Sequence, residues 1–218
     1  MREKTVDNIA LAINAVSFIM GIWAILNNIF CWVEAERIWA TDEYGSFVIL
    51  HYFTNDSNIL LLFAEFLIIV LLIRKIVLKI PLPEWVITFK CIATCSVAIV
   101  FFIIAFGFVL LNKNFTMWAV PNMLFTHLLC PLCAIVSFIF FEPFLEIRKR
   151  VLFYSAIPLI VYMLVITPLA SLGFIGNIYG IMDVFSQPWW VNIMLTVGLI
   201  AVTAFCEFVI ILMRKKLR

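Results

Sequence analysis

The chain has 218 residues, of which 66% are hydrophobic and 13% are charged, and its mean hydropathy is +1.16. Soluble domains are about 45–50% apolar and about 25% charged, so this composition excludes a soluble fold. The net charge of +2 is small and the basic residues form short clusters, which argues against nucleic acid as a partner.

Six long apolar runs follow one another along the chain. A bilayer core about 30 Å thick is crossed by about 20 apolar residues in a helix, and an open sheet cannot satisfy its backbone in lipid. We therefore predict an all-α, polytopic membrane protein with a single domain (1–218) of six transmembrane helices. The predicted spans are 9–32, 48–73, 85–111, 119–141, 151–174 and 189–213.

The positions of Lys and Arg predict the orientation in the cell membrane. Of the 15 basic residues, Arg37 and Lys113 fall on one side, Lys90 lies inside the third span, and the rest share the other side. The residues of this larger group are Arg2, Lys4, Arg74, Lys75, Lys79, Arg148, Lys149, Arg150, Arg214, Lys215, Lys216 and Arg218. Cytoplasmic loops carry an excess of Lys and Arg, so both termini are predicted in the cytoplasm and the acidic segment 34–45 outside.

The second predicted span begins with polar residues at its outer end. On a helix, His51, Thr54, Asn58 and Glu65 fall close to one face. A polar stripe on a helix in lipid must face the bundle interior or a wet cavity. We therefore expect this face to point inward.

The fourth predicted span also enters from outside, and it begins with Asn122, Thr126 and His127. At 1.5 Å per residue, His127 lies about 13 Å and Thr54 about 9 Å below the predicted outer ends of their spans. These depths agree. A threonine hydroxyl and an imidazole are therefore expected to meet in the outer half of the bundle.

Threonine and histidine together suit nucleophilic catalysis. A threonine hydroxyl attacks when a nearby base takes its proton, and histidine suits that task. We expect Thr54 as nucleophile and His127 as base, with Asn58 or Asn122 donating hydrogen bonds to a developing oxyanion. His51 is an alternative base at a more exposed position. A second explanation is that these polar groups only hold the helices together.

Two sequence patches carry a family resemblance. The segments YFTNDSNILLL (52–62) and NMLFTHLLCPL (122–132) resemble the androgen-induced, FAR-type family of integral-membrane threonine hydrolases, and look closest to its six-helix bacterial relatives. The segment NIYGIMDV (177–184) is similar to a third motif of those relatives. The resemblance implies a hydrolase of lipid esters, such as fatty acid esters of hydroxy fatty acids (FAHFA), with Thr54 as nucleophile and His127 as base.

Three charged residues, Glu65, Lys90 and Glu207, lie within predicted spans nearer the cytoplasmic side. A charge at a helix centre costs about 2.5–3.5 kcal/mol, so we expect Lys90 to pair with one glutamate or to reach toward the surface. Alternatively, Glu65 and Glu207 form the ion or proton site of a small-molecule or ion-coupled transporter.

The remaining motifs assign no other chemistry. The six cysteines lie in or beside apolar runs, so we expect packing roles, including for the C-x-x-C pair Cys130 and Cys133. Phosphate-loop, zinc-protease and serine-elbow motifs do not occur in the sequence, and we expect no metal ion and no cofactor. The expected partners are a lipid substrate and membrane lipids. A third possibility for the function is a non-enzymatic, lipid-binding membrane protein.

Overall fold

The computed structural model describes six segments of the chain. They are residues 2–30, 50–103, 121–143, 151–172, 174–175 and 189–217. These residues are almost entirely helical, and no strand occurs among them. Among the described residues, four stretches are long and apolar enough to cross a membrane: Lys4–Phe30, Glu84–Phe102, Pro121–Phe141 and Ile193–Leu217. The all-α polytopic fold is thus confirmed, while the count of six spans and the cytoplasmic termini stay predictions.

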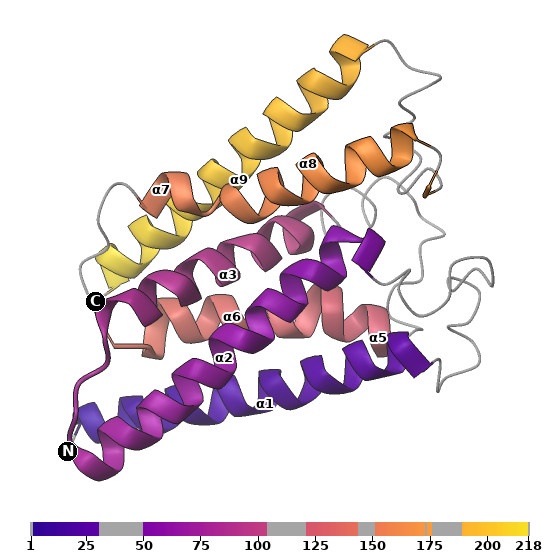
Figure 1. Ribbon diagram of the computed structural model, residues 1–218. Coiled ribbons are helices and arrows are strands. Elements are labelled where there is room, and N and C mark those ends of the chain that lie inside the picture. The colour runs from indigo at the N-terminus through magenta and orange to yellow at the C-terminus, as the bar shows by residue number, and fades with distance from the viewer. Residues whose placement is uncertain are drawn as a thin grey trace.

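The first three helices pack against one another. They are α1 (Arg2–Phe30), α2 (Phe53–Leu78) and α3 (Glu84–Phe102), and α2 packs against both of the others (Figure 1). Gly21 of α1 permits close approach, because a Cβ atom there would lie 2.8 Å from Cδ2 of Leu62 on α2. Small residues at such contacts are typical of membrane helices.

α2 has an apolar outer face and a polar inner face. Apart from Leu78 at its last residue, its exposed large apolar side chains are Phe63, Phe66, Val70, Ile73 and Val77. Their spacing of three and four residues follows one side of a helix. The opposite side is buried and includes the polar residues predicted to point inward. This pattern is the one expected of a helix with lipid on one side and the bundle on the other.

The fourth predicted span is a helical rod with two wide turns. In chain order it comprises α5 (Pro121–Leu124), the π-helical turn η5 (Phe125–Leu129), α6 (Cys130–Val136) and the π-helical turn η6 (Ser137–Phe141). A proline inside a helix cannot donate to the carbonyl four residues earlier, and its ring clashes with that carbonyl. Pro131 therefore accounts for the widening just before it, at His127.

The last part of the chain forms α7 (Val151–Tyr154), α8 (Ile157–Ser171) and α9 (Trp189–Leu217). The fifth predicted span, 151–174, is therefore interrupted at residues 155–156. Pro158 stands in the first turn of α8, where proline is tolerated because that N–H has no helical partner.

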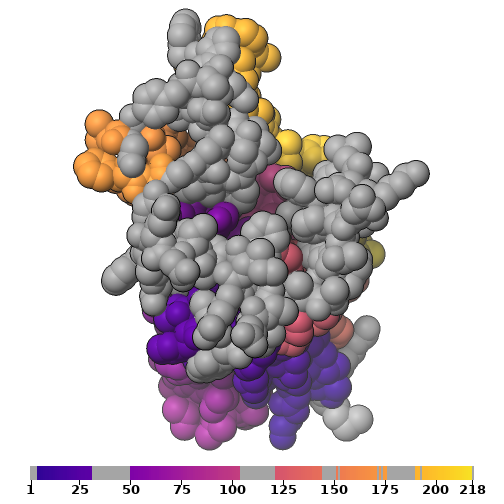
Figure 2. All heavy atoms as spheres, turned by 90° about the vertical axis from the view of Figure 1, so that its right-hand side faces the viewer, coloured from indigo at the N-terminus to yellow at the C-terminus, as the bar shows by residue number. Residues whose placement is uncertain are grey.

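Both ends of the described chain lie at the same end of the bundle. α1 begins and α9 ends on the left in Figure 1. Here the Lys75 Nζ on α2 lies 2.8 Å from the Asp7 Oδ2 on α1. Figure 2 views the opposite end, with α8 and α9 in the upper half and α1 in the lower half. The segments 34–45 and 177–184, and Lys113, lie outside the described residues.

Candidate functional site

The polar face of α2 lies inside the bundle. Thr54, Asn58 and Glu65 are all buried, and the side chains of Asn58 and Glu65 are 1% exposed. His51 lies in a short turn before α2 and is half-buried, and its carbonyl accepts a hydrogen bond of 2.7 Å from the Tyr162 hydroxyl. The inward direction predicted for this face agrees with the structure.

Asn58 joins the start of α2 to the wide turn η5. Its Nδ2 donates to the Thr54 carbonyl oxygen at 2.7 Å and to the Thr126 carbonyl oxygen at 3.0 Å. The turn that carries Thr54 is thereby held against the turn that carries His127. An amide nitrogen has two hydrogens, and both are used here, so a role for Asn58 at an oxyanion requires one of these bonds to open.

His127 has a neighbouring threonine as a hydrogen-bond partner. Its Nδ1 lies 2.9 Å from the Thr126 Oγ1 and 3.1 Å from the Met123 carbonyl oxygen. The Thr126 hydroxyl also donates to the Asn122 carbonyl oxygen at 2.9 Å. Consecutive residues of an α-helix point in different directions, so the sequence pattern did not single out this pair. The π-helical turn is the feature that sequence reasoning missed.

The expected partners Thr54 and His127 are not hydrogen-bonded to each other in this structure. A hydrogen bond from Asn58 to the Thr126 carbonyl oxygen joins their elements, and Leu61 and Phe125 belong to the same apolar cluster. Catalytic hydrogen bonds are often long in a resting enzyme and tighten with substrate. The structure thus brings the two residues into adjacent turns, and their direct pairing stays a prediction.

Three amide side chains extend the polar cluster across the bundle. Asn28 of α1 donates to the Asn55 Oδ1 of α2 at 3.0 Å, and Asn122 of α5 donates to the Asn28 Oδ1. Asn122 is buried, so its amide holds α1 and α5 together. Asn28 was not foreseen as part of the site, because a lone asparagine in the first span carries no pattern.

A second polar cluster surrounds Lys90 on α3. The Lys90 Nζ lies 3.3 Å from the Glu65 Oε1 and 3.9 Å from the Glu142 Oε1. All three side chains are 0–1% exposed. The expected pairing of Lys90 with a glutamate therefore occurs, and Glu65 is the nearer partner.

Glu142 and Arg214 are two further buried charged residues that the sequence analysis did not predict. Glu142 follows the predicted fourth span, yet its Oε1 accepts hydrogen bonds from Asn14 and Ser137, both at 3.2 Å. Arg214 was counted with the cytoplasmic surface residues but is 1% exposed. It donates to the Phe138 carbonyl oxygen at 2.8 Å, and its guanidinium lies 4.1 Å from the Phe138 ring centroid. The buried acidic residues Glu65 and Glu142 are thus matched in number by the buried basic residues Lys90 and Arg214.

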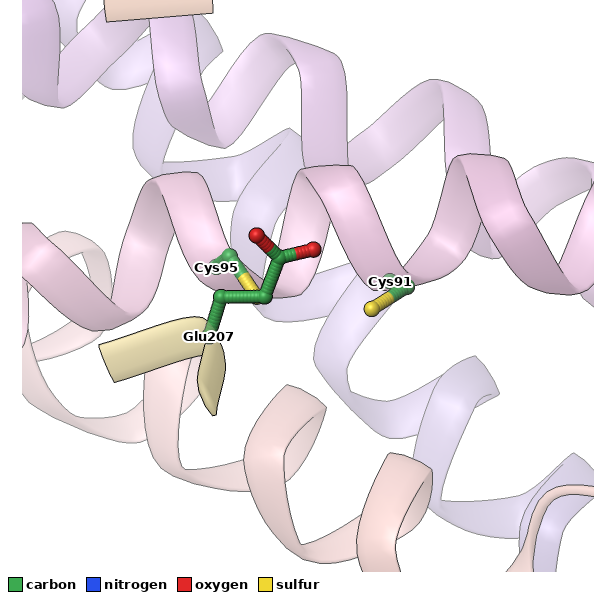
Figure 3. Close-up of side chains that lie close together, drawn as sticks. All are labelled: Cys91, Cys95 and Glu207. Carbon is green, nitrogen blue, oxygen red and sulfur yellow. The ribbon is translucent and has the colours of Figure 1, made fainter. Parts of the chain in front are cut away.

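Glu207 is separate from this cluster. Its carboxylate accepts a hydrogen bond from Ser155 and lies beside Cys91 and Cys95 on α3 (Figure 3). In the part of the chain that the structure describes, no ion pair joins Lys90 to Glu207. The expected group of Glu65, Lys90 and Glu207 is thus divided into two sites.

Comparison with known proteins gives no independent assignment. No protein-family model, curated protein or solved structure matches this chain. Any functional assignment therefore rests on the residues of the two clusters and on the short motifs that contain them.

Proposed function

We propose that this protein is an intramembrane hydrolase of lipid esters, such as fatty acid esters of hydroxy fatty acids, with Thr54 as nucleophile and His127 as base. The observation that carries this proposal is the bridge made by Asn58, which holds the turn of Thr54 against the turn of His127. The resemblance of these turns to the FAR-type threonine hydrolases supports the same assignment.

The hydrogen bonds of His127 favour Thr54 over Thr126 as the nucleophile. When Nδ1 carries the proton, it donates to the Met123 carbonyl oxygen, and Nε2 is then the free acceptor. Fixing one ring nitrogen in this way sets the tautomer and orients the other as the base. Thr126 lies on the Nδ1 side, so a hydroxyl on another helix is needed at Nε2, and Thr54 on α2 is the proposed one.

The reaction then proceeds in two steps. His127 takes the hydroxyl proton while the Thr54 Oγ1 bonds to the ester carbonyl carbon, and the same imidazole returns the proton to the departing alcohol. Water, activated by His127, next hydrolyses the acyl-threonine to release the fatty acid.

The proposal is tested by measuring hydrolysis of a fatty ester in detergent by the wild type and by Thr54→Ala, Thr126→Ala and His127→Ala. We expect Thr54→Ala and His127→Ala each to lower turnover by about 10²–10⁴-fold, and the double variant to be no worse. Thr203→Ala is the matched control, because Thr203 is a buried threonine that donates to a carbonyl of its own helix. If Thr54→Ala keeps full activity and Thr126→Ala loses it, Thr126 is the nucleophile instead. Full activity of both threonine variants contradicts a threonine nucleophile, and absence of hydrolysis by the wild type contradicts the hydrolase itself.

A second candidate function is ion-coupled transport, favoured by the Lys90 ammonium between two buried carboxylates. Buried ionisable groups in membrane helices often mark ion or proton paths. In liposomes, a proton flux that Glu65→Gln and Glu142→Gln abolish, with ester hydrolysis absent, would favour this candidate.

A further inference from the structure

A compact group of metal-binding side chains lies between α3 and α9. Cys91 and Cys95 are four residues apart on α3 and therefore share one face, and Glu207 on α9 points its carboxylate toward them (Figure 3). The two Sγ atoms and a Glu207 oxygen all lie within 4.8 Å of one another. All three side chains are buried.

We propose that Cys91, Cys95 and Glu207 bind a zinc ion in the interior of the bundle. Zinc in proteins is bound tetrahedrally with Zn–S bonds of about 2.3 Å and Zn–O bonds of about 2.0–2.2 Å, so its ligand atoms stand about 3.5–3.8 Å apart. The separations here are all within 4.8 Å, so they exceed that geometry by at most about 1 Å. Two thiolates with one carboxylate favour zinc over magnesium or calcium, which take oxygen ligands.

The hydrogen bonding of Glu207 independently points to a ligand. One carboxylate oxygen accepts from the Ser155 hydroxyl, whereas Oε1 is buried and has no hydrogen-bond partner within the described residues. A buried polar atom without a partner is costly and rare. A cation at Oε1 satisfies it, and Ser155 then acts as the outer partner that orients the ligating carboxylate.

Zinc at this site also has a consequence for the fold. It links α3 directly to α9, and the bound thiols release their protons because the thiolate is the ligand. Three protein ligands leave a fourth position on the ion, as in zinc sites that accept water or a further ligand. The sequence predicted only packing roles for these cysteines, because the pair on α3 gains its third ligand, Glu207, from the last helix of the chain.

Zinc retention by the purified chain tests the proposal. The protein is prepared in detergent with a phosphine reductant, stripped with a chelator, incubated with zinc and dialysed, and its metal content is measured. We expect about one zinc per wild-type chain and none in the Cys91→Ser/Cys95→Ser variant. Cys133→Ser is the matched control, because Cys133 is a half-buried cysteine outside this group, and it should retain zinc.

A second measurement on the wild type does not depend on the folding of any variant. Cobalt(II) in place of zinc should give the near-ultraviolet charge-transfer absorption of thiolate ligands. The affinity of the protein for cobalt should rise with pH, by up to about 100-fold per pH unit, because two thiols lose protons on binding. Absence of the thiolate band at saturating cobalt overturns the proposal. The proposal is also overturned if the Cys91→Ser/Cys95→Ser variant retains as much zinc as the Cys133→Ser control.

Discussion

Removing the Lys90 ammonium should strongly destabilise the protein. At an effective dielectric constant of about 20, attraction over the 3.3 Å to Glu65 is roughly 5 kcal/mol, and over the 3.9 Å to Glu142 roughly 4 kcal/mol. Desolvation of the buried charges offsets much of this, at several kcal/mol per ion. Lys90→Met leaves two buried carboxylates without their cation, and we expect a loss of about 3–5 kcal/mol.

The comparison that isolates this effect is a double-mutant cycle with Glu65→Gln, measured by unfolding in detergent. The double variant should be more stable than the sum of the single changes implies, by about 0.5–3 kcal/mol. Lys75→Met is the matched control, because the same substitution at the part-exposed pair with Asp7 should cost only about 1 kcal/mol or less. The electrostatic reasoning is refuted if Lys90→Met is as mild as this control, or if Glu65→Gln gives no compensation.

Three further predictions concern Asn58, Arg214 and the orientation of the chain in the membrane. Asn58→Ala should lower stability by about 1–3 kcal/mol through loss of its two hydrogen bonds, and should also lower ester turnover; unchanged thermal unfolding would show that the bridge is unimportant. Arg214→Met should cost about 2–4 kcal/mol, since it removes charged hydrogen bonds to the carbonyl oxygens of Phe138 and Pro143. Substitution of its exposed neighbour, Lys215→Met, should be nearly neutral. Reporter fusions at both termini should report the cytoplasm, and an external C-terminus would reverse the orientation.

Helical periodicity and hydropathy made much of the fold predictable. The inward face of α2 follows from the spacing of Thr54, Asn58 and Glu65, because a polar stripe in lipid has only one stable direction. The depth of His127 below the outer end of the fourth span stays a prediction. These are properties of single helices, and a single helix is what a sequence pattern describes.

Contacts between helices were not predictable in the same way. Glu142 and Arg214 stand at the ends of apolar runs, where the usual expectation is contact with water. The packing of η6 against α1, α3 and α9 buries them. The pairing of Thr126 with His127 depends on a π-helical turn, for which the sequence offers only Pro131 as a hint. The grouping of Glu207 with two cysteines depends on how α3 and α9 meet.

The most direct test of the proposed hydrolase is to map a covalent adduct on the purified protein. After reaction with a fluorophosphonate, digestion and mass spectrometry should locate the adduct on Thr54, because an activated hydroxyl is the group that such a probe modifies. Thr54→Ala and His127→Ala should prevent labelling, while Thr203→Ala should leave it unchanged. An active protein that is labelled elsewhere, or labelling at Thr54 that persists in His127→Ala, would contradict the assignment of nucleophile and base.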